Sequence, residues 1–241
     1  GSSSGALGKY LMDHHLGNRA GGTIEGYEDK YTFGRRANGF YIPRFRNING
    51  EKRDYIRGFG YQGSANRAGW GHDVAEVSIG GKFKDALTEP GGWSIGMMGF
   101  GEMLPDETNK VTLDKTKKDK WGLNVLNIDC ELKDNEIKMR KDILEDAKEM
   151  LERAGAKNVQ GYEGDGTPGR GIHEMGTARM GRDPKTSVLN KNNQVWDCLN
   201  VFVTDGACMT SASCVNPSLT YMALTARAAS FAVEELKKGN L

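Results

Sequence analysis

The sequence predicts an α+β fold in which an antiparallel sheet is covered on one side by helices. Two observations carry this prediction. Residues 21–131 hold short apolar bursts between glycine-rich turns, a texture typical of strands. Apolar residues at helical spacing follow only after residue 134. Strands and helices that occupy separate stretches of a chain favour the α+β arrangement.

The expected strands are short. In 123–131 apolar residues alternate with polar ones, so we expect a sheet with one face toward solvent. A compact apolar run at 199–204 ends at Asp205 and Gly206, which predicts a buried strand that leads into a turn. The other expected strands lie at 40–42, 55–59, 93–104 and 111–113.

Two helices are expected. Apolar residues recur at helical spacing over 136–154, and Gly155 stands where this helix would end. A second helix begins at Asn216 and Pro217, because proline suits a first helical turn, and lysines stand near its end. Between the two helices, 161–171 holds five glycines and is expected to be a loop.

The composition excludes several kinds of partner. Lys and Arg number 33 against 32 Asp and Glu, which gives a net charge of +1, so we expect no nucleic-acid partner. No run approaches the roughly 18 apolar residues of a membrane span, so direct membrane insertion is not expected either. Four cysteines without a Cys-x-x-Cys pair are expected to be reduced and buried. The compartment is not indicated.

Two motifs imitate binding sites. Residues 164–169 match the Gly-x-Gly-x-x-Gly letters of a dinucleotide-binding turn, but that turn needs a strand before it and a helix after it. Asp13, His14 and His15 could offer metal ligands, yet consecutive side chains point in different directions and no Cys or Glu stands nearby at ligand spacing. We therefore expect a plain loop, no metal site, and ordinary packing for the two histidines.

Two segments near the C-terminus stand out together. In 171–181 a lone histidine, His173, opens a His-x-x-Gly-Thr block among glycines, and in 200–220 a strand ending in Asp-Gly precedes Asn-Pro-x-Leu-Thr and a helix. This order resembles the C-terminal signature of the glucose-methanol-choline (GMC) oxidoreductases, FAD enzymes that oxidise alcohols and sugars. Residues 7–14 also resemble a segment that follows most of the FAD-binding region in such enzymes. Within the family, the chain is similar to bacterial gluconate dehydrogenase large subunits and, more distantly, to pyranose oxidases.

The resemblance implies roles for the matching residues. His173 stands at the position of the base that removes the hydroxyl proton as hydride passes to flavin N5, and a neutral imidazole suits that task. Asn216 stands where the family has His or Asn and would hold the substrate oxygen. The same helix start would face the flavin N1/C2 carbonyl, and because Pro217 lacks an N–H, a later amide must donate there. The residues expected along FAD are Asp205, Gly206, Asn216, Pro217, Ser218 and Thr220.

The resemblance also divides the chain. Residues 1–20 would be a leader and a family segment, 21–170 the substrate domain, and 171–241 the catalytic and flavin-contacting segment. The family's Rossmann strand and glycine-rich turn precede this region, so we expect a fragment whose partner is a missing N-terminal FAD-binding domain. Alone, the fragment is expected to be inactive, to bind FAD weakly, and to be able to form a homo-oligomer through uncovered apolar surface.

Two other functions stay open. A stand-alone carbohydrate-binding module could stack sugar rings on exposed tryptophans. The candidates are Trp70, Trp93, Trp121 and Trp196. A hydrolase could use His173 with Asp165 and a serine, although the sequence offers no credible nucleophile elbow.

Overall fold

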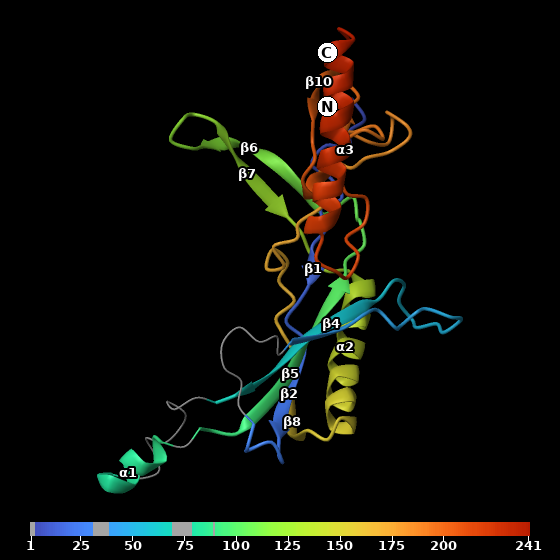
Figure 1. Ribbon diagram of the computed structural model, residues 1–241. Coiled ribbons are helices and arrows are strands. Elements are labelled where there is room, and N and C mark those ends of the chain that lie inside the picture. Colours follow the sequence, from blue (N-terminus) through green and yellow to red (C-terminus); the bar gives the residue numbers. More distant parts are fainter. Residues whose placement is uncertain (1–2, 31–38, 69–78, 89) are drawn as a thin grey trace.

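The computed structural model describes residues 3–30, 39–68, 79–88 and 90–241. Its centre is an antiparallel sheet in the order β3-β4-β5-β2-β8, and the short β1 pairs with the C-terminal end of β5 (Figure 1). The predicted α+β architecture with an antiparallel sheet is confirmed. The strands are β1 (His14–His15), β2 (Arg19–Ile24), β3 (Gly39–Ile42), β4 (Phe59–Arg67), β5 (Trp93–Glu102) and β8 (Lys157–Tyr162).

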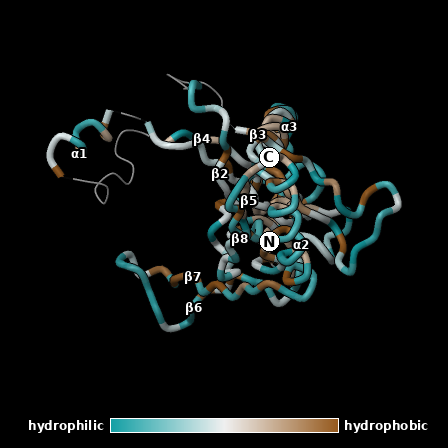
Figure 2. The backbone as a smooth tube through the Cα atoms, turned by 90° about the horizontal axis from the view of Figure 1, so that it is seen from below, coloured by the Kyte–Doolittle hydropathy of each residue, from teal (hydrophilic) through white to brown (hydrophobic). Residues whose placement is uncertain are grey.

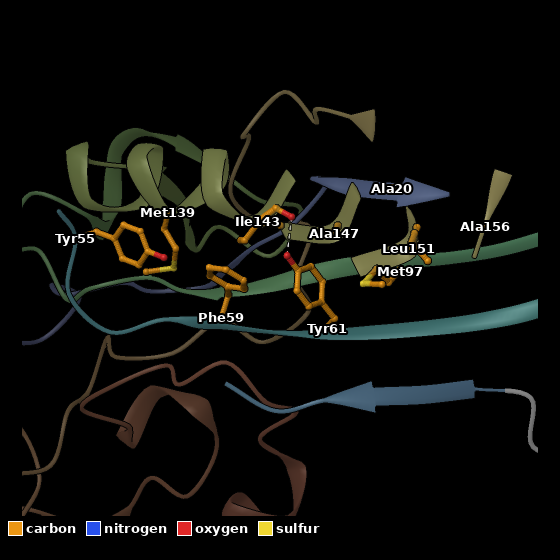
Figure 3. Close-up of a cluster of buried hydrophobic side chains, with 10 residues drawn as sticks. All are labelled: Ala20, Tyr55, Phe59, Tyr61, Met97, Met139, Ile143, Ala147, Leu151 and Ala156. Atoms are coloured by element: carbon orange, nitrogen blue, oxygen red, sulfur yellow. Dashed lines mark hydrogen bonds between the residues drawn. The ribbon is translucent and has the colours of Figure 1, made fainter. Parts of the chain in front are cut away.

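One helix, α2 (Asp134–Arg153), covers one face of this sheet and crosses β2, β5 and β8. Its apolar side chains recur every four residues at Ile143, Ala147 and Leu151, which places them on one stripe of the helix. Figure 3 shows this stripe over the aromatic rings of β4, where Tyr61 Oη donates a 2.7 Å hydrogen bond to the carbonyl of Ile143. Burial of a large apolar side chain such as Ile143 or Leu151 contributes about 1.5–3 kcal/mol. The buried cluster comprises Ala20, Tyr55, Phe59, Tyr61, Met97, Met139, Ile143, Ala147, Leu151 and Ala156.

The helix lies close to the sheet because β5 carries a glycine beneath it. A Cβ at Gly99 would stand 2.3 Å from Cγ2 of Ile143, a distance that no side chain tolerates. The glycine-rich texture of the sequence therefore serves close packing of helix on sheet as well as turns.

The sheet differs from the prediction at three strands. Residues 55–57 form bends, and β4 begins only at Phe59. The strand β2 begins before the expected stretch, and β8 follows α2 and includes Gly161, which was expected in a loop. The reason is composition: β8 has one apolar β-branched residue, Val159, so no period-2 pattern marks it.

A hairpin projects away from the sheet. It consists of β6 (Lys110–Lys118) and β7 (Asn124–Asp129), which pair only with each other among the described strands. Figure 2 shows it standing clear of the rest of the chain, like the small helix α1 (Gly81–Ala86). The expectation that 123–131 has one buried face is wrong, because Leu126 and Ile128 are both 64% exposed.

The C-terminal segment builds a second core beyond the β1 end of the sheet (Figure 1). It contains β9 (Gln194–Val195), β10 (Cys198–Phe202), the 3-10 turn η1 (Gly206–Cys208) and α3 (Ser218–Lys237). Its buried side chains come from both ends of the chain, since Ala6 packs with residues that follow position 177. The cluster comprises Ala6, Ala178, Val188, Leu189, Val195 and Cys208.

Two expectations about burial are wrong in this segment. The strand β10 was expected to be buried, but Leu199 is 55% exposed because β10 pairs only with the two-residue β9 among the described strands. The four cysteines are free, yet only Cys208 and Cys214 are buried, whereas Cys198 is exposed on β10. The first-turn Leu219 of α3 is also exposed, so an apolar surface runs along this part of the molecule.

Candidate active site

The structure brings His173 and Asn216 together across 43 residues of sequence. Nδ2 of Asn216 lies 3.4 Å from Nε2 of His173. His173 lies in the loop before a short bridge at Met175, and Asn216 lies two residues before α3. The two side chains that the resemblance assigns to substrate therefore meet at one point.

The loop that carries His173 is anchored by the N-terminal segment. Met12 and Met175 exchange two backbone hydrogen bonds of 2.8 Å. The buried carboxylate of Asp13 accepts from the backbone N–H of Gly169 and of Gly171, each at 3.0 Å. The segment at residues 12–14 thus fixes the backbone on both sides of His173.

His14 is the third side chain at this point, and it was not among the expected site residues. Its Nδ1 lies 3.2 Å from Nδ1 of His173, and its Nε2 lies 3.2 Å from the carbonyl oxygen of Ala212. The two imidazoles meet edge to face, with centroids 4.9 Å apart and planes at 70°. Ordinary packing was expected for both adjacent histidines, and this holds only for His15, whose Nε2 contacts Sδ of Met139 on α2.

The side chains of His14 and His15 lie on opposite faces of the sheet, because successive side chains of a strand alternate. His15 pairs with Gly101 and points to the face that α2 covers, and a Cβ at Gly101 would stand 1.8 Å from its ring. His14 points to the opposite, open face, where Phe100 meets its ring edge to face. The earlier expectation that consecutive residues point in different directions is correct, but one of them reaches His173.

Burial lowers the pKa of both histidines of β1. For His14, desolvation lowers the pKa below its usual 6.5, the bond to the Ala212 carbonyl raises it, and the neighbouring His173 lowers it further. For His15, desolvation is again the largest cause, with the charge of Arg140 next, and the pKa falls to about 3. Both imidazoles are therefore neutral at pH 7.

The open face of the sheet joins the site through Gln62 on β4. Its Nε2 donates a 2.7 Å hydrogen bond to Oδ1 of Asn216. Gln62 follows Tyr61, which faces α2, so strand alternation places Gln62 on the uncovered face. There a wide depression of about 770 Å³ crosses four strands, β2, β4, β5 and β8. Its polar lining residues stand among glycines and apolar side chains such as Met97 and Met98, and include Arg19, Gln62, Ser64, Ser94, Gln160 and Tyr162.

The residues expected along FAD lie around the same point. Gly206 is buried, and its carbonyl accepts from the N–H of Gly176; a Cβ at Gly206 would stand 2.3 Å from the carbonyl oxygen of Glu174. The Asp205 carboxylate accepts from the N–H of Ala207 at 3.0 Å and caps η1. The backbone at Gly206 therefore touches the loop of His173 directly.

The start of α3 offers backbone donors. Pro217 occupies the capping position and is buried, and no side chain within the described residues caps the helix. Ser218 and Thr220 are exposed in its first turn. A helix start without a side-chain cap leaves N–H groups that favour electron-rich partners.

The alternative sites find less support. Trp70 lies outside the described residues. Trp93 and Trp196 donate their indole N–H groups to Tyr27 and Ser187, and the exposed Trp121 stands on the distant hairpin, so these three rings form no common platform. Asp165, the acid expected of a hydrolase, forms an ion pair of 2.9 Å with Arg170.

Two other features are absent from the part of the chain that the structure describes. No three His, Cys, Asp or Glu side chains gather there in a manner that could hold a metal ion. No helix there has the length and apolar character needed to span a bilayer.

Comparison with known proteins places the chain in a family. Residues 105–225 match the family model described as GMC oxidoreductase. The 2-methyl-1,2-propanediol dehydrogenase of Mycolicibacterium austroafricanum is 34% identical over 239 residues, which cover 95% of this chain and 42% of that protein. The fructose dehydrogenase large subunit of Gluconobacter japonicus is 26% identical, over 99% of this chain and 43% of that protein.

A third relative is the gluconate 2-dehydrogenase flavoprotein of Pantoea cypripedii, 29% identical over 61% of this chain and 25% of that protein. The chain thus spans less than half the length of these curated relatives. The resemblance to gluconate dehydrogenase subunits is confirmed. With half of its residues matched by the family model, the chain belongs to the GMC oxidoreductase family.

Proposed function

We propose that this chain is the C-terminal part of an FAD-dependent oxidoreductase that oxidises a CH–OH group of an alcohol or sugar, with His173 as the base. One observation carries the proposal: Nε2 of His173 and Nδ2 of Asn216 lie 3.4 Å apart beside the open face of the sheet. An acceptor and a donor at this separation suit the hydrogen and the oxygen of a single hydroxyl group.

The two side chains would divide the work on the substrate. Nε2 of His173 accepts the hydroxyl proton, and Nδ2 of Asn216 donates to the hydroxyl oxygen and holds it in place. Gln62 keeps the amide of Asn216 in the required orientation, because its N–H already occupies Oδ1. FAD, when bound, supplies the flavin N5 that accepts the hydride.

The residues present fit a flavin. The buried Gly206 leaves no room for a side chain between the backbone and the loop of His173, and the uncapped start of α3 supplies N–H donors toward negative charge. We assign Gly206, Asp205 and the residues Pro217, Ser218 and Thr220 to this side of the site. Exposed apolar side chains on β10 and α3 would be covered by the FAD-binding domain of the complete protein. They include Leu199, Val201, Leu219, Met222 and Leu236.

The open face favours a small, oxygen-rich substrate. Its depression presents hydroxyl, amide and guanidinium groups from the strands, and the Arg19 guanidinium lies 4.7 Å above the ring of Tyr162. Such groups bind sugars and small diols better than long alkyl chains. The names of the relatives, a propanediol dehydrogenase, a fructose dehydrogenase and a gluconate dehydrogenase, agree with this class.

The experiment is an anaerobic reduction assay with the complete flavoprotein. The purified protein is expected to be yellow, and sugars or short diols should bleach its flavin, whereas a long-chain primary alcohol should not. A protein that carries no flavin, or a flavin that no alcohol or sugar reduces, would contradict the proposed function.

A further inference from the structure

We propose that His14 is a positioning residue that fixes the tautomer of His173, so that the unprotonated nitrogen of His173 is Nε2. The inference deepens the proposed function and rests on it. It follows from the direction of a chain of hydrogen bonds that runs from Gln62 to the backbone of Ala212.

The direction is set first at Ala212. A backbone carbonyl can only accept, so Nε2 of His14, which lies 3.2 Å from this oxygen, carries the proton. His14 is 2% exposed, and burial keeps its imidazole neutral. A neutral imidazole with its proton on Nε2 has a lone pair on Nδ1.

That lone pair determines the state of His173. Nδ1 of His173 lies 3.2 Å from Nδ1 of His14 and must donate to it. With its proton on Nδ1, the His173 base has its lone pair on Nε2, the atom that faces Asn216. The Asn216 end of this series of hydrogen bonds leads to the same tautomer. Oδ1 of Asn216 accepts from Gln62, so Asn216 has only N–H groups left to offer Nε2 of His173.

His14 cannot turn away from this position. It is paired with Glu102 on β5 through the backbone of β1, and Phe100 lies against its ring. The backbone N–H of His14 donates to Oδ1 of Asp13 at 2.7 Å, and the same carboxylate holds Gly171 in the loop before His173. The segment at residues 12–14 therefore sets both the place and the protonation of His173.

The arrangement also serves the protonated state. When Nε2 of His173 takes the hydroxyl proton, the ring becomes an imidazolium whose Nδ1–H continues to donate to Nδ1 of His14. The hydrogen bond becomes charge-assisted and stronger, while the abstracted proton stays on His173. The ionisable groups that face His14 are His173 and Asp13, and the Asp13 carboxylate is engaged by three backbone N–H groups.

The test uses the complete flavoprotein and two substitutions at one position. His14→Leu removes the acceptor, and His14→Asn keeps an amide oxygen near the place of Nδ1. We expect His14→Leu to lower the rate of flavin reduction by about 10²- to 10⁴-fold, because a base in the wrong tautomer loses up to about 10⁴ in turnover. KM should change little. His14→Asn should reduce its flavin at least about tenfold faster than His14→Leu.

A spectroscopic measurement tests the tautomer itself. In protein labelled with ¹⁵N histidine, the His173 signals should show a protonated Nδ1 and an unprotonated Nε2, and this assignment should be lost in His14→Leu. His15→Leu is the matched control, since it removes an equally buried neighbouring imidazole that does not touch His173. It should leave the tautomer and the rate unchanged.

Specific outcomes overturn the inference. A wild-type spectrum with an unprotonated Nδ1 on His173 would do so, as would a His14→Leu enzyme that reduces its flavin within twofold of wild type. If His14→Leu fails to fold, the wild-type spectrum and the rate of His14→Asn decide. Failure of the proposed function can be told apart from failure of this inference. If the proposed function is wrong, His173→Ala also leaves the rate of flavin reduction unchanged.

Discussion

The backbone N–H of Gly171 donates to Oδ2 of Asp13 over 3.0 Å, and a Cβ at Gly171 would stand 2.1 Å from Oδ1 of the same carboxylate. The two residues are 158 positions apart in sequence. Their contact joins the N-terminal segment to the loop that carries His173, and it leaves no space for a side chain at position 171.

Gly171→Ala should therefore displace the Asp13 carboxylate and with it the loop of His173. We expect flavin reduction in the complete protein to slow at least about tenfold, because small misplacements of a base cost about 10² in rate. The control is Gly92→Ala, where the added Cβ meets nothing within 4 Å. Equal rates for the two variants would show that the contact between positions 13 and 171 does not hold the site.

Asn216→Ala should lower the rate of flavin reduction by about 10²-fold, the usual effect of losing one donor to a reacting oxygen. The flavin potential should shift as well, because the substitution disturbs the start of α3. Gln62→Leu removes only the support of the amide and should cause a smaller loss of rate. Stopped-flow reduction measures the rate, and a potentiometric titration measures the flavin potential. If Asn216→Ala has the wild-type rate and the wild-type potential, Asn216 is only a residue at the start of the helix.

His15 should make the protein less stable as the pH falls. Its pKa is 6.5 in the unfolded chain and about 3 in the folded one, so between these values the unfolded chain binds a proton that the folded chain does not. The free energy of unfolding thus decreases from pH 6.5 toward pH 3. His15→Leu removes this pH-dependent contribution to stability. The free energy of unfolding of the variant minus that of wild type should therefore be about 2 kcal/mol more positive at pH 5 than at pH 7.

Urea unfolding at the two pH values measures that difference. His14, whose pKa is also lowered, is present in both proteins and its contribution cancels from the comparison. A difference that does not change with pH would mean that His15 titrates near its ordinary value and is not shielded from water.

Residues 1–241 by themselves should bind FAD weakly. Tight dinucleotide binding needs a glycine-rich turn between a strand and a helix, and 164–169, which has the letters of that turn, lies in a loop whose Gly169 is held by Asp13. The contacts near Gly206 and the start of α3 reach the flavin end alone. Calorimetric titration of FAD into the purified chain tests this, and micromolar or tighter binding would reveal a complete cofactor site within it.

Periodicity in the sequence was sufficient for the regular parts of the fold. The apolar stripe of α2 and the bursts at β3 and β5 lie where they were expected, because the spacing of apolar residues indicates the type of element. The strand β8 was not predicted because it contains a single apolar β-branched residue, Val159. The burial expected for β10 was wrong, because burial depends on which elements cover a strand and not on its own letters.

The site could be predicted only in part. His173 and Asn216 came from the resemblance to a family, since nothing in their spacing joins two residues that are 43 positions apart. His14 was missed because its contact with His173 spans 159 positions and exists only after β1 pairs with β5. An Asp-His-His run in which strand alternation sends the two imidazoles to opposite faces is the signal that could have identified it.

Single-turnover flavin reduction in His173→Ala tests whether His173 is the base of an alcohol-oxidising flavoprotein. If His173 is the base, the rate should be about 10²- to 10⁴-fold below wild type, with flavin content unchanged and with His15→Leu at the wild-type rate. A His173→Ala protein that reduces its flavin within twofold of the wild-type rate would show that His173 is not the base.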